Sequence, residues 1–355
     1  LSLRRQRQMC IRDRTVYVED IPSNEIDNWA RIQADRFKNP VIRGFHTELE
    51  TIYEEKNMSL TQDSRKVWEA MDAALFPHHP YGTQTVLGTQ EHLKNPSITN
   101  VKNYHKTYYV PNNMAVCVSG DFDPDEMVAT IEKYFGDMQP NPNLPKLHFE
   151  PEQPITAPVV KEVYGLEAAN VMLGWRLPGA TDPSTDVANI VGSVLYNGQA
   201  GLIDLDLNQQ QKVLSAYGYA SSQPDYGTFL VAGRPKAGQS LDEVRDMLLS
   251  EVAKLRNGDF DESLIEATIN NYKMQMMRSF EETKAARCST STRSSTAPTG
   301  PTKCSSSTAC RRSPSRTSWT GPTNTSAPKV MPSSTSVKAK TPTSRRSQPR
   351  RSRRS

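Results

Sequence analysis

Apolar side chains recur every three to four positions through the first hundred residues, a pattern that predicts a series of amphipathic helices. The clearest helix follows Ser23, a suitable N-cap, and carries Trp29 and Phe37 on one side before Asn39-Pro40 stops it. Proline and glycine divide the segments that follow. The expected helices are residues 23–38, 43–58, 64–75 and 96–108, with a turn-rich loop at 76–88.

A second pattern, an apolar strand followed by a polar turn and an amphipathic helix, occurs twice. The first copy is NMAVCVSG-DFDPDE-MVATIEKYFGDM at 113–138, and the second is TFLVAG-RPKAGQSLDE-VRDMLLSEVAKLRNG at 228–258. Repeated units of this kind indicate an α+β protein with two related domains, each an antiparallel sheet packed with helices. Six prolines at 139–158 predict a linker. We therefore expect one domain at 15–138, a linker at 139–157 and a second domain at 158–287.

Alternation and turn residues predict the remaining elements of the second domain. The expected strands are 159–164, 171–176, 214–220 and 228–233, and the expected helices are 184–195, 201–210 and 263–283.

The two ends of the chain differ from its body in composition. Residues 288–355 contain 18 Ser, 13 Thr and 14 Lys or Arg but no Asp, Glu, Leu, Ile, Phe or Tyr, so they cannot build a core. This abrupt change is typical of a coding region read in the wrong frame, and a genuine disordered tail is the alternative. Residues 1–14, with five Arg, resemble an artefactual leader. We expect a disordered, low-complexity tail and exclude both ends from the fold.

With both ends set aside, the body is acidic. Residues 15–287 carry 24 basic and 38 acidic side chains, a formal charge of −14, although the whole chain is +4. An acidic body repels phosphate backbones, so we expect no nucleic-acid partner, and it is compatible with basic or extended peptides. No apolar stretch of the body is long enough to cross a bilayer. Its single cysteine, Cys117, lies in an apolar run and is expected to be a small buried hydrophobe.

Two carboxylates, Glu48 and Glu55, lie two turns apart on one predicted helix and close to the same face. Carboxylates at this spacing can serve one metal site, one as ligand and the other as its supporting partner. Their spacing alone favours a solvated acidic surface, because Glu50 and Glu54 stand beside them. His46 and Glu50 are likewise expected to form a surface pair.

The order of several short motifs favours a metal site at Glu48 and Glu55 over a solvated acidic surface. They are WAR at 29–31, ELETIYEEKN at 48–57, FPHHPYG at 76–82, TVLGTQEHL at 85–93, YHKTYYVPNNMAVCVSGDFDPDEM at 104–127 and KYFGDM at 133–138. In this order they resemble the catalytic domain of the pitrilysin/insulinase family of zinc metallopeptidases, the inverzincin type that bears H-x-x-E-H. The resemblance covers residues 15–140, and residues 155–287 more loosely resemble the non-catalytic domain that follows in the family.

This resemblance implies zinc bound by the two histidines of the motif and by a downstream glutamate, which falls on Glu55, with Glu48 as the supporting acidic residue. No H-x-x-E-H occurs in the chain. The family places the motif ahead of residue 1, so the zinc site is incomplete and no catalytic residue is assigned. His78 and His79 are adjacent in a turn and cannot replace a pair at i, i+4, and His105 is expected to be structural.

The leading hypothesis is a fragment of a zinc-dependent metalloendopeptidase that cleaves peptides, itself inactive as written. Its expected partners are a peptide substrate and the missing N-terminal and C-terminal parts of the same protein. The alternative is a non-catalytic homologue that acts as a structural or substrate-binding subunit. A third interpretation, a basic nucleic-acid-binding protein, rests only on the tail. The compartment stays open, with bacterial periplasm and cytoplasm both compatible.

Overall fold

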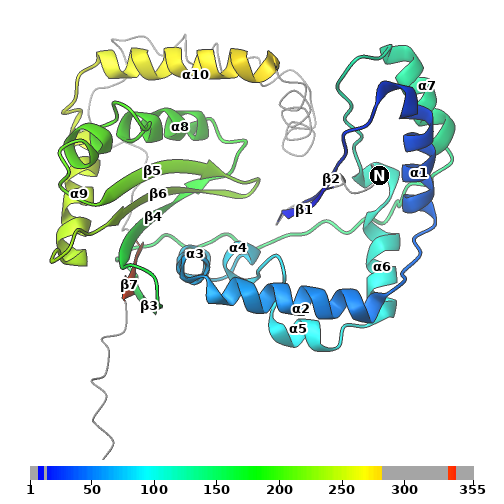
Figure 1. Ribbon diagram of the computed structural model, residues 1–355, viewed down its shortest axis with the longest axis horizontal. Helices are drawn as coiled ribbons and strands as arrows, with labels where there is room; N and C mark the ends of the chain where they lie inside the picture. The colour runs from blue at the N-terminus through cyan, green and yellow to red at the C-terminus, as the bar shows by residue number, and fades with distance from the viewer. Residues whose placement is uncertain (1–6, 12–13, 282–334, 341–355) are drawn as a thin grey trace, which may run out of the picture.

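The computed structural model describes residues 7–11, 14–281 and 335–340, which form two regions joined by an extended segment. One region is a sheet with helices on both faces, and the other is largely helical (Figure 1). Helices mixed with mainly antiparallel strands confirm the α+β class. Within the described residues, no helix combines the length and the apolar character that crossing a membrane requires.

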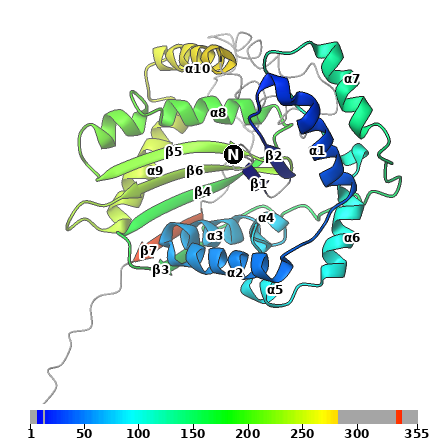
Figure 2. The ribbon, with the colours of Figure 1, turned by 45° about the vertical axis from the view of Figure 1, so that its right-hand side comes forward.

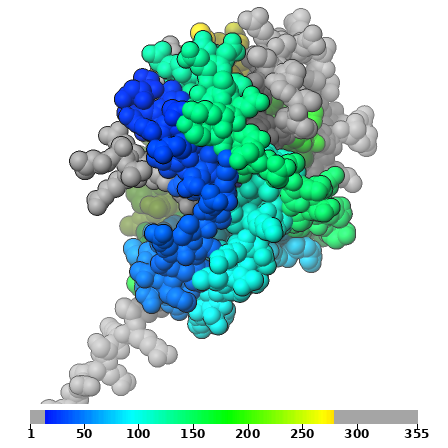
Figure 3. Space-filling view, turned by 90° about the vertical axis from the view of Figure 1, so that its right-hand side faces the viewer, coloured from blue at the N-terminus to red at the C-terminus, as the bar shows by residue number. Residues whose placement is uncertain are grey.

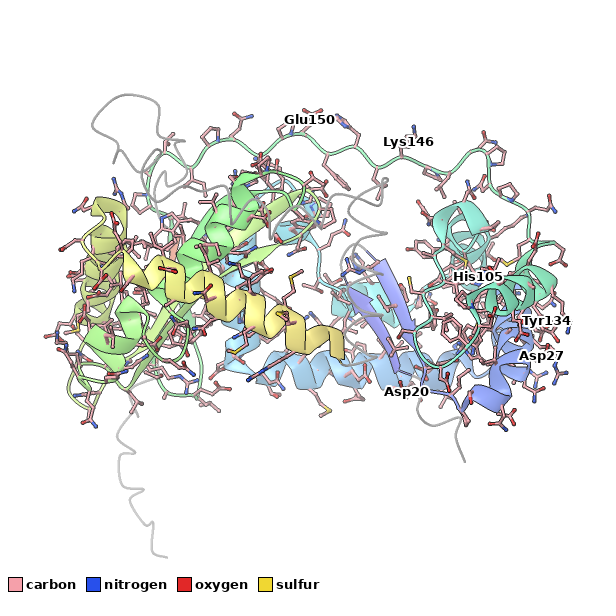
Figure 4. All side chains as sticks on the ribbon, turned by 90° about the horizontal axis from the view of Figure 1, so that it is seen from above. Asp20, Asp27, His105, Tyr134, Lys146 and Glu150 are labelled. Atoms are coloured by element: carbon pink, nitrogen blue, oxygen red, sulfur yellow. The ribbon has the colours of Figure 1, made fainter. Side chains whose placement is uncertain are left out.

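The helical region comes from the N-terminal part of the chain. Its elements are β1 (Arg7–Ile11), β2 (Arg14–Val18), η2 (Ser23–Glu25), α1 (Ile26–Lys38), α2 (Phe45–Thr61), α3 (Asp63–Leu75), α4 (Pro80–Thr83), α5 (Gln90–Lys94), α6 (Ile98–Tyr108), η3 (Pro111–Asn113) and α7 (Pro124–Phe135). The predicted helices are therefore confirmed. Helices α1 and α7 pack together, and there the Tyr134 hydroxyl donates to Asp27 Oδ2 at 2.7 Å (Figure 4).

The strand expected at residues 113–120 belongs to no sheet of the described residues. Residues 114–118 run on from η3 without a ladder partner there. The prediction of a paired strand is wrong at this place. A strand needs a neighbour for its backbone hydrogen bonds, and the described strands of this region, β1 and β2, pair with each other and not with residues 114–118. The helix of the same unit does form as α7, with Asp123 as its N-cap and Pro124 in its first turn.

The sheet region follows the linker. Its elements are β3 (Val160–Tyr164), β4 (Asn170–Pro178), α8 (Ser184–Leu195), the π-helical turn η4 (Asp204–Asn208), β5 (Ser215–Ser222), β6 (Tyr226–Arg234), α9 (Leu241–Asn257), α10 (Ser263–Glu281) and β7 (Thr335–Lys340). The strands lie in the order β3-β7-β4-β6-β5. Strand β6 pairs antiparallel with β4 on one side and with β5 on the other, with Trp175 opposite Phe229.

Both faces of this sheet are covered, because alternate side chains along a strand point to opposite sides. One face packs against α8 and α9, and helix α3 covers the other (Figure 2). The α9 face is lined by Val171, Leu173, Trp175, Leu177, Phe229 and Val231. The α3 face joins Met172, Leu230 and Ala232 to Val67, Met71 and Leu75. A helix that precedes the linker in sequence therefore completes the core of the sheet region.

The close approach of α3 to β4 depends on Gly174. A Cβ placed there would lie 2.7 Å from Met71 Sδ and 3.3 Å from a Leu75 methyl carbon. A larger residue would push α3 off the sheet, since cores at this packing density have no spare volume.

The proline-rich segment forms no helix or strand between α7 and β3, and it runs as one extended stretch through Lys146 and Glu150 (Figure 4). Strand β7 lies within residues 288–355, the segment expected to be low-complexity and disordered, and it inserts between β3 and β4. The other residues of that segment lie outside the described ones.

Candidate functional site

Helix α2 carries the two carboxylates that the sequence singles out. It begins after Gly44, which has a left-handed φ of 62°, and it ends before Gln62. Leu49, Ile52 and Lys56 lie on its inner side, and Lys56 alone is buried. Helices α1 and α2, in blue, lie open on the face of the molecule that Figure 3 shows.

Lys56 anchors α2 to its neighbours. Its Nζ lies 3.5 Å from Glu69 Oε1 on α3 and 3.4 Å from Thr85 Oγ1. The side chain of Gln90 donates to Asn57 Oδ1 at 2.6 Å, which ties the same turn of α2 to α5. Because a buried ammonium must keep its partners, these contacts fix the rotation of α2 about its axis.

Glu48 and Glu55 are both exposed, on the flank of α2 beside its buried side. Seven residues separate them, so their Cα atoms stand about 10 Å apart along the axis. Neither carboxylate forms a hydrogen bond or ion pair with another described residue. Nowhere in the described part of the chain do three His, Cys, Asp or Glu side chains come together as a metal site would require. The donors among the described residues therefore do not fit a zinc ion on their own.

Of the two adjacent histidines in the turn, His79 serves packing. The His79 ring is 2% exposed and packs against Tyr81, Phe149 and Tyr226, at centroid distances of 4.2, 4.8 and 5.2 Å. Its Nδ1 accepts the backbone N–H of Tyr81 at 3.2 Å, which caps α4. His78 is exposed.

His105 and Cys117 also have structural environments. The His105 ring stacks on Tyr109 at 4.5 Å, and burial lowers the pKa of its imidazole. Cys117 is partly buried, and burial raises the pKa of its thiol, which favours the protonated form.

A buried polar cluster that the sequence does not predict joins the two regions. The Glu152 carboxylate accepts the backbone N–H groups of His78 and His79 at 2.8 and 2.7 Å. Arg176 of β4 donates through Nε to the carbonyl of Leu75 at 2.9 Å. Partners that lie 73 to 101 residues apart leave no local pattern to read.

Two further buried charges lie away from the carboxylate helix. Asp63, at the start of α3, accepts the backbone N–H of Glu167 at 2.7 Å, and this bond, with that from Lys66, holds the pKa of the carboxyl below its usual 3.8. Burial raises the pKa of Glu251, whose carboxylate bonds Lys254 Nζ at 3.0 Å. Each group is occupied by a structural partner.

Comparisons with known proteins point to one family. Residues 97–272 match the family described as Peptidase M16 inactive domain. The chain is 20% identical to "Zinc protease PqqE" of Helicobacter pylori over 58% of this chain and 47% of that protein. It is 25% identical to "Uncharacterized zinc protease YmxG" of Bacillus subtilis over 67% of this chain and 57% of that protein. The chain thus spans about half the length of these curated relatives.

Solved structures agree on the fold. The crystal structure of a peptidase M16 inactive domain from Pseudomonas fluorescens superposes with a TM-score of 0.72 at 12% identity, covering 96% of this chain and 81% of that one. The interval that matches the family starts just before α6 and ends within α10, so it includes the linker and parts of both the helical region and the sheet region.

Proposed function

Because the chain belongs to the M16 family of peptidases, the pitrilysin/insulinase group, we propose that it is part of a zinc-dependent metalloendopeptidase. In this proposal the chain contributes Glu55 as a zinc ligand and Glu48 as the carboxylate that supports Glu55. The names of the curated relatives support zinc as the metal of the whole protein.

The observation that carries the proposal is the disposition of α2. Its inner side is fixed by the buried Lys56 and its contacts with Glu69 and Thr85, while Glu48 and Glu55 extend from the exposed flank without a described partner. A carboxylate on a rigidly anchored helix is suited to receive a metal ion whose other ligands come from another segment.

The proposal assigns no hydrolytic step to these 355 residues. Their described donors do not hold a zinc ion alone, and the sequence contains no H-x-x-E-H. The proposed partners are a peptide substrate and further parts of the same polypeptide, with no nucleic acid, as the acidic body suggests. Residues 15–138 would form part of a catalytic-type domain, 139–157 the linker and 158–287 a related non-catalytic domain.

A second candidate function is that of a non-catalytic subunit that binds substrate or supports a partner. The description of the matched family as an inactive domain favours it, since that family covers residues 97–272.

The coding sequence distinguishes the two candidates. An H-x-x-E-H encoded about 70 to 80 residues before Glu55 is expected for the peptidase, and a degraded motif at that place would favour the subunit. Reading the DNA in all three frames beyond residue 287 tests the tail: a continuing amphipathic pattern in another frame is expected if 288–355 arise from a frameshift.

The 355-residue chain itself provides a biochemical test. After dialysis against zinc, we expect less than about 0.1 equivalent bound per chain, because one carboxylate gives only weak affinity. One tightly bound zinc would contradict the assignment of an incomplete site.

A further inference from the structure

His79 lies at a place where three parts of the chain meet. Its ring belongs to the turn before α4, and it contacts Phe149 of the linker and Tyr226 of β6. The linker is bound at the same place, because the Glu152 carboxylate accepts two backbone N–H groups of this turn and the Glu152 N–H donates to the Tyr226 hydroxyl at 2.9 Å. The residues around the His79 ring therefore join the helical region to the sheet region.

The hydrogen bond at Nδ1 of His79 requires a neutral ring. Nδ1 accepts the backbone N–H of Tyr81, so this nitrogen carries no proton and the ring proton is on Nε2. An imidazolium has a proton on both nitrogens and can accept no hydrogen bond. Protonation of His79 therefore removes the N-cap of α4 and sets two N–H groups against each other.

Tyr81 connects this cap to the sheet region. Its side chain is buried and packs edge-on against Phe76, with 5.7 Å between the ring centroids. Its hydroxyl donates to Asp225 Oδ2 at 3.4 Å and accepts the Asp225 backbone N–H at 3.3 Å, in the turn between β5 and β6. Because one residue binds the cap at its backbone and this turn at its hydroxyl, loss of the cap weakens the contact between α4 and the turn.

The charges around the His79 ring do not offset the loss of the cap. Asp225 Oδ2 lies 3.5 Å from Nε2 and attracts an imidazolium, but the Asp225 side chain is 54% exposed, so water screens this attraction. Burial of the ring opposes its charging. Glu152 lies opposite a cation of its own, Arg176, whose Nη2 is 3.8 Å from Glu152 Oε2. The ionisable side chains around the ring thus come from the β5–β6 turn (Asp225), β6 (Tyr226), α4 (Tyr81), the linker (Glu152) and β4 (Arg176).

We propose that His79 is an acid-sensitive link between the helical region and the sheet region. With a neutral ring it caps α4 and keeps the linker and the β5–β6 turn in contact with α4, and with a protonated ring it releases both. The opening is confined to this junction, because residues 160–281 of the sheet region contain no histidine. The proposal does not depend on the assignment of Glu55 to zinc.

The pH range of the opening follows from the two states of the ring. In the open state the imidazole titrates near the ordinary pKa of histidine, about 6.5, whereas the closed state keeps the ring neutral. The closed state therefore has its full stability above about pH 6.5. Each pH unit below that value shifts the equilibrium towards the open state by up to about tenfold.

Hydrogen exchange of the full chain at about pH 7 and pH 5, measured by mass spectrometry and corrected for the intrinsic rate at each pH, tests the proposal. We expect the protection of residues 78–83 and 149–153 to fall at least about tenfold at pH 5, whereas the protection of residues 229–233 stays within about twofold.

Two variants assign this response to one ring. His79→Asn should abolish it, because asparagine can still cap α4 through its side-chain oxygen and does not titrate. The matched control is His78→Asn at the exposed neighbouring position, which should keep the response.

Long-range ¹H–¹⁵N NMR spectra of the His79 ring test the tautomer directly. At pH 7 we expect the proton on Nε2 and none on Nδ1. A proton on Nδ1 at pH 7 would overturn the proposal, even if His79→Asn does not fold. So would equal protection of residues 78–83 at both pH values, or a pH response that persists in His79→Asn or disappears in His78→Asn.

Discussion

The two strand-turn-helix units of this chain share a local sequence pattern and reach different structures. In the sheet region β6 is buried between β4 and β5, and α9 places Val244, Leu248, Val252 and Leu255 in the core. In the helical region residues 114–118 have no described ladder partner, and Met127 is the buried residue of α7. Local sequence is sufficient for the helix in both units, but burial of the strand depends on neighbours from elsewhere.

The capping of the two helices shows that the difference does not arise locally. Ser240 and Glu243 form a capping box at the start of α9, and Asp123 accepts two backbone N–H bonds at the start of α7. Each helix thus has a complete N-terminal signal. What separates the units is the sheet that one of them joins.

The largest expected effect comes from removing one aromatic side chain in each unit, Phe229 from strand β6 and Phe122 from the turn before α7. Phe229→Ala should lower the free energy of unfolding by about 3–5 kcal/mol, because Phe229 is fully buried against Trp175. Phe122→Ala should cost about 1 kcal/mol or less, because that ring is only partly buried. Urea unfolding measures both losses. Equal losses in the free energy of unfolding would contradict the claim that only the sheet-region unit is packed into a core.

A smaller loss is expected when the buried carboxylate of α9 loses its partner. Lys254→Met should cost about 1–3 kcal/mol at neutral pH, because Glu251 stays buried without its ammonium.

The pH dependence of this loss follows from the pKa of Glu251, which burial raises above 4.5. The folded state takes up a proton more readily than the unfolded state, so the loss should shrink as the pH falls from 7 towards 4.5. Unfolding curves of Lys254→Met against the parent chain measure this. A loss that grows on acidification would contradict the assigned cause.

The smallest effect is expected at the contact between α3 and the loop after β3. The pKa of Asp63 is held below 3.8 by the Glu167 N–H and by Lys66, so its contribution is present above pH 3.8 and is lost as the pH falls below it. Asp63→Asn should lower the melting temperature at pH 7 less than Lys254→Met does, and it should flatten the acid slope below pH 4. Asp259→Asn, at an exposed site, serves as control. An unchanged acid slope would exclude Asp63 as its source.

Much of the sheet region could be predicted from sequence, because the alternation at 171–176 and 228–233 and the turn between β5 and β6 are local signals. The packing of α3 on the far face could not be predicted. The apolar stripe of α3 indicates that this helix packs against another element, but its partner Met172 lies about a hundred residues away in the sequence. Gly174 likewise gives no local sign that α3 approaches β4 closely.

The candidate site was predictable only through the order of motifs around Glu55. Helix periodicity places Glu48 and Glu55 on one flank of α2, and the structure keeps them there, exposed and without described partners. The buried Lys56 beside Glu55 went unpredicted, because a lysine in an acidic helix is typically solvated and its partners Glu69 and Thr85 come from other elements.

The central claim is that the helical region supplies a zinc ligand to a larger peptidase, and metal analysis of the protein translated from the complete reading frame tests it most directly. Glu54→Gln, on the neighbouring exposed position, should retain about one zinc per chain, and Glu55→Gln should retain less than about 0.1 after dialysis. Equal zinc content in the two variants would contradict the assignment of Glu55.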